Sequence, residues 1–410
     1  MIYDVIIIGG GIAGLNIAYQ LTKTSTTFLL LEQSKHLGGR IATFHSKTMT
    51  VEMGAGRFSP KHHPLLKQLL QEFGLFDKRV KNNKHSEYIP LNPEKSDTKK
   101  EINQYLSTVF EKSKQVPNEI LRQMTFEEYA KTVILETQVE EIKKSFGYYS
   151  ELVIMNAYDS IRLMKVLDTS FYSLDGGFSQ LIERMRDHIL QFKNPFRYQQ
   201  EVLDIIPTRY ADSDYYQIPT KKGKIYHARK CILAIPKESL EKIPVLRSIQ
   251  SMLSQVKTSP LCRIYSRFED PWFSDLSKIM TDDALRMVIP INENILMSYT
   301  DNKYANYWKR IDTKKIDETL VKHLQKVIKK THPEIEVPFP EETHVFYWEH
   351  GVGYWTKHAN SEETSKKMLQ PFLSDPLRKH IYICGESYSE NQQWIEGSLE
   401  TSMKVLKLAF

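Results

Sequence analysis

Three glycines near the start of the chain have the spacing of a nucleotide-binding turn. Gly9, Gly11 and Gly14 follow an apolar, β-branched run at residues 5–8 that is typical of a buried strand. In such a strand-to-helix turn, the first glycine permits the tight turn, the second leaves room for a pyrophosphate, and the third lets the helix pack on the strand. The helix then offers unpaired N–H groups to the phosphates. The expected cofactor-binding residues here are Gly9, Gly11, Ile12, Ala13 and Gly14.

A second apolar strand, expected over residues 28–31, ends in an acidic side chain. Glu32 stands 18 residues after Gly14, where a carboxylate can accept hydrogen bonds from ribose hydroxyls. A carboxylate favours a free 2′-hydroxyl over a 2′-phosphate, which indicates FAD or NAD rather than NADP. Glu32 and the adjacent Gln33 are therefore candidate cofactor-binding residues.

The segment that follows resembles the flavin amine oxidase superfamily, which includes monoamine, polyamine and L-amino acid oxidases. It reads Leu37-Gly38-Gly39-Arg40-Ile41-Ala42-Thr43, and the family has a Gly-Gly-Arg-x-x-Thr element at this place. The resemblance implies FAD rather than NAD, with Gly39 and Arg40 near the pyrophosphate and ribityl chain. A turn with a solvated arginine is the alternative.

A second match, Gly54-Ala55-Gly56-Arg57-Phe58, resembles the family's turn beside the flavin in the form found in L-amino acid oxidases. There the resemblance implies that Arg57 binds the substrate carboxylate, a task that suits the forked donors of a guanidinium. Two alternatives stay open, because Arg57 could instead contact a flavin phosphate or pair with a buried acid. Gly56 and Arg57 are candidate cofactor-binding residues, and Arg57 is also a candidate catalytic residue.

Near the carboxyl end, an apolar strand ends in Gly385-Glu386, and Trp394-Ile395 leads a helix. The resemblance implies that Gly385 and Glu386 contact ribityl or phosphate groups. It also implies that the turn at Trp394 and Ile395 lies against the pyrimidine edge of the flavin. Peptide N–H groups at this helix start would stabilise the negative charge that reduction places there.

Aromatic side chains are expected to frame the substrate. By resemblance, Tyr354 stands beside the isoalloxazine, and with Trp394 it would form two walls of an aromatic cage; plain core packing is the alternative. Gly353 falls where monoamine oxidases carry the cysteine that binds flavin, so we expect non-covalent FAD. Glu396 and Glu400 would oppose the field at the flavin edge, so we expect both to point outward.

Arg263 departs from the family pattern. It falls on an alternating strand expected over residues 260–272, where amine oxidases place a lysine that hydrogen-bonds a water near flavin N5. An arginine donates hydrogen bonds but cannot lose its proton and act as a base. This puts rapid turnover in doubt, and an outward-facing arginine is the alternative. By resemblance, Val202 on another expected strand touches the adenine through its backbone.

The elements that must position these residues predict an α/β fold. We expect a Rossmann-like FAD-binding domain of the GR2 flavoprotein type and an α+β substrate domain on a mixed sheet with a helical insertion. A capping box at Thr125 and Glu128 begins the insertion, and residues 77–103 are typical of an exposed connection with little core. The expected ranges are 1–75, 174–260 and 376–410 for the FAD-binding domain, and 76–173 and 261–375 for the substrate domain.

Composition excludes several function classes. The chain has 410 residues, and its 41% hydrophobic and 26% charged residues are typical of a globular protein. Lysines scattered among acids, with a net charge of +6, favour a solvated surface over a nucleic-acid interface. Three separated cysteines predict neither a disulfide nor a metal site. Without an expected signal peptide or membrane anchor, we expect a cytoplasmic location.

Together these features predict an FAD-dependent amine oxidoreductase. It would move a hydride from the substrate C–N carbon to flavin N5, giving an imine and, with molecular oxygen as acceptor, hydrogen peroxide. The candidate catalytic residues are Arg57, Arg263, Tyr354 and Trp394. An apolar cage disfavours the ammonium form of the substrate, so the sequence names no protein base. Two alternatives stay open: an L-amino acid oxidase with Arg57 as carboxylate clamp, and a catalytically impaired FAD-binding scaffold, which Arg263 favours.

Overall fold

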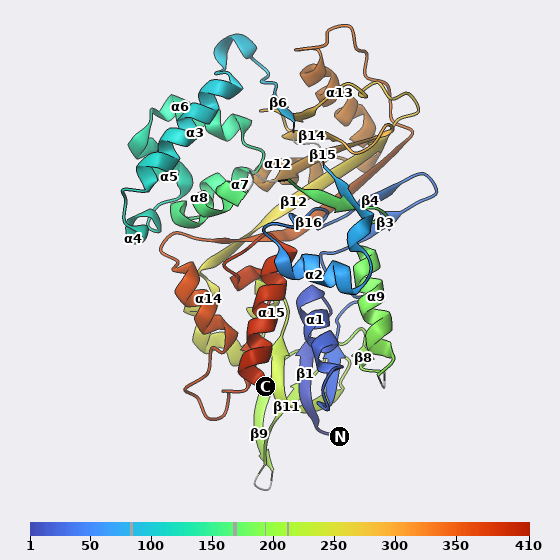
Figure 1. The fold of residues 1–410 in the computed structure, drawn as a ribbon, viewed down its shortest axis with the longest axis vertical. Coiled ribbons are helices and arrows are strands. Elements are labelled where there is room, and N and C mark those ends of the chain that lie inside the picture. Colours follow the sequence, from blue (N-terminus) through green and yellow to red (C-terminus); the bar gives the residue numbers. More distant parts are fainter. Residues whose placement is uncertain (83–84, 167–169, 193, 211–212) are drawn as a thin grey trace.

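The computed structural model describes residues 1–82, 85–166, 170–192, 194–210 and 213–410. Within these residues, the structure contains two large mixed β-sheets, and helices pack beside both of them (Figure 1). A seven-stranded sheet lies in the lower half of the view and a six-stranded sheet in the upper half, with the helices of residues 99–166 beside the latter. The α/β fold class expected from the sequence is confirmed.

The seven-stranded sheet has the order β8-β2-β1-β11-β10-β9, with β17 beside β11. β1 runs parallel to β2 and β11, and β17 runs parallel to β11. The register places Ile8, Leu31, Leu233 and Ile383 in one row, so the residues directly after these four strand ends meet at one edge. We call it the carboxyl edge. The strands are β1 (Tyr3–Ile8), β2 (Phe28–Leu31), β8 (Phe196–Arg197), β9 (Ile206–Tyr210), β10 (Ser213–Pro219), β11 (Ile225–Leu233) and β17 (Ile381–Ile383).

Both faces of this sheet are covered, which explains the unbroken apolar run in β1. Val5 and Ile7 face one core with the helices α1 (Ile12–Leu21), α2 (Pro64–Glu72), α9 (Ser179–Leu190) and α15 (Ile395–Ala409). Ile6 and Ile8 face a second core. The elements on that side include α10 (Lys237–Leu240), η3 (Pro244–Ile249), α11 (Gln250–Leu253) and α14 (Ser361–Leu369). A strand buried on both faces loses the usual alternation of polar and apolar residues.

The six-stranded sheet has the order β16-β12-β15-β14-β13-β6. One face packs on α12 (Asn302–Lys309) and α13 (Ile316–Ile328), and the inward residues expected on α13, Leu320 and Leu324 among them, are buried. The other face carries Tyr265, Tyr299 and Phe346 and contacts the hairpin of β3 (Thr43–His45) and β4 (Thr50–Glu52). The strands are β6 (Ser86–Tyr88), β12 (Val256–Arg267), β13 (Lys278–Met280), β14 (Met287–Pro290), β15 (Ile295–Asp301) and β16 (Glu342–Trp355).

The helical insertion begins earlier than the expected start at Thr125, because two helices of residues 99–121 precede it, and it consists of short helices around its own core. Thr125 and Glu128 form the predicted capping box at the start of α5. The helices are α3 (Lys99–Ser113), α4 (Asn118–Leu121), α5 (Phe126–Val133), α6 (Glu136–Ser145), α7 (Tyr149–Val153) and α8 (Ala157–Val166). The remaining short elements are η1 (Phe76–Lys78), η2 (Pro93–Lys95), η4 (Thr313–Lys315), η5 (Glu386–Tyr388), and the paired strands β5 (Arg79–Lys81) and β7 (Tyr172–Leu174).

The expectation that residues 77–103 form an exposed connection with little core is wrong in part. β6 in this range pairs with β13, and Ile89 is buried in the core of the six-stranded sheet. The pairing partner lies nearly two hundred residues further along the chain, so a short polar strand gives no local signal of it.

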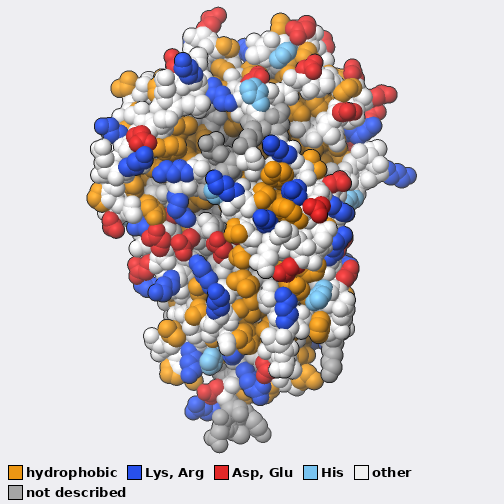
Figure 2. All heavy atoms as spheres, viewed as in Figure 1, with side chains coloured by type: hydrophobic (Ala, Val, Ile, Leu, Met, Phe, Trp, Pro, Cys, Tyr) orange, Lys and Arg blue, Asp and Glu red, His pale blue; other side chains and the backbone are white. Residues whose placement is uncertain are grey.

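The surface mixes both signs of charge. Figure 2 shows Lys and Arg side chains interspersed with Asp and Glu side chains over one face of the molecule. Among the helices of the described ranges, none has the length and apolarity needed to cross a membrane.

Candidate functional site

The glycines of the first turn occupy three different environments. A Cβ on Gly9, whose φ is +107°, would lie 2.4 Å from the Ala234 carbonyl oxygen, and a Cβ on Gly14 would lie 2.0 Å from the Gly9 carbonyl oxygen. Only glycine fits at either position. A Cβ on Gly11, by contrast, would meet nothing within 4 Å. Gly11 is the N-cap of α1 and no side chain caps the helix, so open space adjoins the helix N-terminus.

The two ends of the chain meet at this open space. Gly38 N donates to the Gly10 carbonyl at 2.8 Å, which seats the second glycine loop on the first turn. Arg40 then forms an ion pair with Glu386, with 3.0 Å between Nη1 and Oε2. Next to Glu386, a Cβ on Gly385 would again meet nothing within 4 Å. The segments of residues 9–14, 38–40 and 385–386 therefore surround one open region.

Glu32 lies at the same carboxyl edge. Its carboxylate accepts hydrogen bonds from Gly10 N and Ser34 N, both at 2.7 Å, while the neighbouring Gln33 is exposed. Gln200 N donates to the Glu32 carbonyl at 2.8 Å. This bond places the segment that leads to Val202 beside Glu32. Val202 itself is half-buried and forms a β-bridge with Thr220.

This edge fits a dinucleotide. Open space lies beside two glycines, an uncapped helix N-terminus faces it, and a carboxylate stands at the end of the adjacent strand. Unpaired N–H groups at a helix start bind phosphates, and the absence of a Cβ lets a ligand approach the backbone closely.

Arg57 lies among aromatic rings, an arrangement that we call the Arg57 box. Its Nη2 donates to Tyr148 Oη at 2.5 Å, and the guanidinium carbon lies 4.6 Å from the ring centre of Phe171 and 5.5 Å from that of Trp394. Phe171 and Trp394 stack with an interplanar angle of 5°. No carboxylate among the described residues forms an ion pair with Arg57, so the direct contacts of its charge there are with aromatic rings and a phenol.

Trp394 and Tyr354 do not form a ring pair with each other among the described residues. Tyr354 is fully buried, and its strand pairs with β12. Trp394 is half-buried and contacts Phe171 and His63. The arrangement of Tyr354 and Trp394 as two walls around a substrate stays a prediction.

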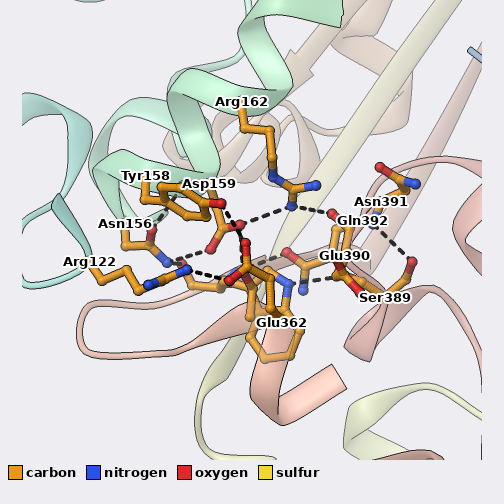
Figure 3. A network of polar contacts seen from close by, with 12 residues as sticks. Arg122, Asn156, Tyr158, Asp159, Arg162, Glu362, Ser389, Glu390, Asn391 and Gln392 are labelled. Carbon is orange, nitrogen blue, oxygen red and sulfur yellow. Dashed lines mark hydrogen bonds and ion pairs between the residues drawn. The ribbon is translucent and has the colours of Figure 1, made fainter. Parts of the chain in front are cut away.

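The loop that leads to Trp394 is held by a polar network that Figure 3 shows. Arg162 of α8 bridges Asp159 and the Glu390 carbonyl. Trp355, at the end of β16, donates its backbone N–H to Gln392 Oε1 at 2.9 Å and its indole N–H to the Ser389 carbonyl at 3.0 Å. The helical insertion and the six-stranded sheet thus both position this loop.

Arg263 points into the molecule. Its Nη1 donates to the Glu52 carbonyl at 3.0 Å, where Tyr265 Oη also donates, and its guanidinium carbon lies 4.9 Å from the Tyr299 ring centre. A Cβ on Gly56 would lie 3.1 Å from Nη1. Arg263 therefore holds the turn that carries Gly56 and Arg57. The alternative of an outward-facing arginine is wrong.

Glu396 corrects one expectation. It is fully buried, and its two carboxylate oxygens accept hydrogen bonds from Leu65 N at 2.8 Å and Leu66 N at 2.9 Å in the first turn of α2. The outward orientation expected for Glu396 is wrong, because the unpaired N–H groups of α2 need an acceptor. Burial raises its pKa to about 7. Glu400 is half-buried and accepts hydrogen bonds from Asn391 Nδ2.

Two charged residues near the Arg57 box were missed by the sequence analysis. Glu151 on α7 is buried, and burial raises the pKa of its carboxyl to about 8. Lys278 on β13 lies on the sheet face that carries Arg263 and Tyr299. Strand pairing puts Met280 opposite Met287, Met287 opposite Tyr299, and Tyr299 opposite Arg263, so these four side chains share one face. Lys278 lies two residues before Met280 on the same strand and therefore faces the same side. Burial, then the charge of Arg57, lowers the pKa of Lys278 to about 7. Neither residue belongs to a local motif that a sequence pattern could find.

Among the described residues, no group of three His, Cys, Asp or Glu side chains is placed to hold a metal ion.

Comparison with known proteins agrees with this geometry. The model of the family described as flavin containing amine oxidoreductase matches residues 12–405. An L-amino acid oxidase of Cerastes cerastes is 23% identical over 460 aligned positions, which cover 97% of this chain and 85% of that protein. (S)-6-hydroxynicotine oxidase of Paenarthrobacter nicotinovorans is 40% identical over 76 residues, but the match spans only 18% of each protein.

Solved structures share the fold. A putrescine oxidase variant from a redesign of cofactor binding superposes with a TM-score of 0.78 at 15% identity, covering 100% of this chain and 99% of that one. Wild-type putrescine oxidase bound to putrescine gives 0.76 at the same identity and coverage. The family match spans nearly the whole chain, and the fold agrees with it. The chain belongs to the family of flavin-containing amine oxidoreductases.

Proposed function

We propose that the protein is an FAD-dependent oxidase of a small-molecule amine or amino acid, with molecular oxygen as acceptor and an imine and hydrogen peroxide as products. The observation that carries this proposal is a contact between the two parts of the site. Glu386 pairs with Arg40 at the dinucleotide edge, and its Oε1 accepts the N–H of Gln393 at 2.8 Å. The residue beside Trp394 is thereby fixed to the edge where the cofactor would bind.

The residues that would hold FAD are those around the open region. They are Gly9, Gly11, Ile12, Ala13, Gly14, Glu32, Gln33, Gly39, Arg40, Gly56, Arg57, Val202, Gly385, Glu386, Trp394 and Ile395. Binding would be non-covalent, because Gly353 offers no thiol and the nearby Cys384 is buried. Burial raises the pKa of the Cys384 thiol, which disfavours the reactive thiolate.

The chemistry that bound FAD supplies is acceptance of a hydride from the carbon of the substrate C–N bond. The protein's own residues would orient that bond and exclude water. Phe171 and Trp394 offer a flat, apolar wall, and the start of α15 at Ile395 offers peptide N–H groups to developing negative charge. Arg263 would keep the turn beside the cofactor in place.

A narrower candidate is the oxidation of an amino acid. It is favoured by Arg57, a cation without an ion-pair partner among the described residues, and by the further positive charge of Lys278 on the adjacent sheet face. Two neighbouring cations are suited to a carboxylate. The third candidate, an FAD-binding scaffold without turnover, rests on Arg263 in place of the family's lysine.

An anaerobic spectroscopic test separates the three candidates. Purified protein with FAD is mixed with a panel of L-amino acids, then with mono-, di- and polyamines, and the flavin absorbance is followed. Bleaching by amino acids alone supports the narrower candidate, and bleaching by amines supports the broader one. If dithionite bleaches the flavin but no amine or amino acid does, the scaffold candidate holds and the proposed oxidation is contradicted.

A further inference from the structure

Glu151 is held rigidly at the base of the helical insertion. It lies on α7, whose first backbone N–H groups, from Tyr149 and Ser150, donate to the Asp301 carboxylate at 3.1 and 2.7 Å. Ser160 Oγ donates to the Glu151 carbonyl at 2.9 Å. The backbone that carries Glu151 is therefore held by contacts from both the sheet and α8.

One oxygen of the Glu151 carboxylate has no well-placed hydrogen bond. Glu151 is 2% exposed, and no described residue meets its Oε2 with good hydrogen-bond geometry. The amide nitrogen of Gln393, beside Trp394, is likewise buried without a well-placed acceptor among the described residues, although this amide acts on the charge of Glu151. Burying a carboxylate oxygen without a partner is costly, and such groups in a folded protein cluster at functional sites.

The surroundings of Glu151 are those of the proposed substrate site. The groups that act on its charge are Asp301 of β15, Arg57, the Gln393 amide, and the phenols of Tyr148 and Tyr354. Burial and the like charge of Asp301 raise the pKa of Glu151 to about 8, and Arg57 and Gln393 lower it less. A carboxyl that exchanges its proton near neutral pH is well matched to general acid–base work.

Glu151 in its ionised form and Arg57 carry opposite charges, and they form no ion pair with each other among the described residues. Tyr148, which accepts the hydrogen bond of Arg57, precedes Glu151 by three residues. An anion and a cation held apart in one site are complementary to a ligand that carries an ammonium and a carboxylate.

We propose that Glu151 binds the substrate ammonium and accepts one of its protons, with Arg57 taking the carboxylate of an amino acid. This inference rests on the proposed function. In the step, one N–H bond of the ammonium breaks, its electron pair stays on nitrogen, and an O–H bond forms on Glu151. The resulting neutral amine has the lone pair that hydride loss from the adjacent carbon requires. No sequence motif marks a base, and this part falls to Glu151.

The test compares the FAD-loaded wild type with Glu151→Gln by anaerobic flavin reduction between pH 6 and 10, using one amino acid that reduces the wild type. The control is Glu141→Gln, a buried glutamate of the same insertion that pairs with Lys144 outside the site. We expect Glu151→Gln to reduce at least 100-fold more slowly at pH 7. The ratio of the wild-type rate to the Glu151→Gln rate should fall to less than about threefold at pH 10, where much of the substrate amine is already neutral.

Three results decide the inference. Equal rates for wild type and Glu151→Gln contradict it, and so does a loss that is the same at every pH, because a merely structural role has no reason to be rescued by substrate ionisation. A loss in Glu141→Gln equal to that in Glu151→Gln also contradicts it. A wild type that no amine or amino acid reduces contradicts the proposed function instead. Because Gln cannot ionise in the buried site, Glu151→Gln should fold at least as stably as wild type, which thermal unfolding checks.

Discussion

Arg40 and Glu386 come from opposite ends of the chain and form an ion pair with 3.0 Å between Nη1 and Oε2. Glu386 is only 5% exposed and also accepts the N–H of Gln393. One carboxylate therefore links the amino-terminal glycine loops, the end of β17 and the loop that carries Trp394. The proposed cofactor site and the Arg57 box are parts of one connected structure.

The Arg40 pair should stabilise the fold more than a surface pair does. Arg40→Met leaves the buried Glu386 without its cation and should lower the free energy of unfolding by about 1–3 kcal/mol in urea titrations at pH 7. The control is Arg229→Met, which breaks the exposed pair with Asp4 and should cost less than about 1 kcal/mol. Equal costs for both variants would contradict the structural role given to Glu386.

Gly11 and Gly14 should respond to substitution in opposite ways. Gly11→Asp supplies a good N-cap for α1 in open space, so the cofactor-free protein should unfold no more easily than wild type, but the added charge should abolish FAD binding. Gly14→Ala places a Cβ 2.0 Å from the Gly9 carbonyl oxygen and should yield little folded protein. Circular dichroism and flavin absorbance measure the two effects. FAD retention by Gly11→Asp would show that the phosphates bind elsewhere.

Arg57 should distinguish substrates by their carboxylate. Arg57→Met should slow flavin reduction by amino acids about 100-fold while leaving amines without a carboxylate within about threefold. The matched control is Arg79→Met, because Arg79 lies over the Phe76 ring at 4.0 Å, outside the site. An equal loss on every substrate together with loss of FAD would assign Arg57 to the cofactor.

The stability of the protein should depend on pH through Glu151. Its folded pKa of about 8 exceeds the unfolded value of 4.5, so the folded state binds the extra proton between these values. Wild type should therefore lose stability relative to Glu151→Gln as the pH rises from 5 to 8, by up to about 4 kcal/mol. Urea midpoints measured at each pH check this, and a constant difference would contradict the raised pKa.

Lys278 should show the opposite slope. Burial and the charge of Arg57 lower its folded pKa to about 7 from 10.5, so the unfolded state binds the extra proton between these values. Wild type should gain stability relative to Lys278→Met as the pH rises from 7 to 10. If the stability of wild type relative to Lys278→Met fell between pH 7 and 10 instead, Lys278 would be paired with an anion rather than placed near Arg57.

Features set by neighbouring residues could be predicted from the sequence. The glycine turn, the capping box at Thr125 and the buried face of α13 depend on spacing within one or two turns of chain, and the structure has them all. The close contacts at Gly9 and Gly14 follow from the same local pattern. The assignment of chain ranges to two domains stays a prediction.

Features set by distant partners could not be predicted in this way. Glu396 was expected to face solvent because it is charged, yet it caps α2, more than three hundred residues away in sequence. Glu151 sits in an apolar stretch without a motif, and only the packing of α7 against Asp301 places it near Arg57. A charged side chain carries no local sign of whether folding will bury it.

The central claim is that the segments around Gly11 and Gly385 together bind FAD without a covalent bond. The most direct measurement is the absorbance spectrum of the purified protein, before and after acid precipitation, with the released chromophore identified by chromatography. We expect a yellow protein that releases all of its flavin as FAD into the supernatant. A colourless protein that takes up no added FAD, or one that binds NAD instead, would contradict it.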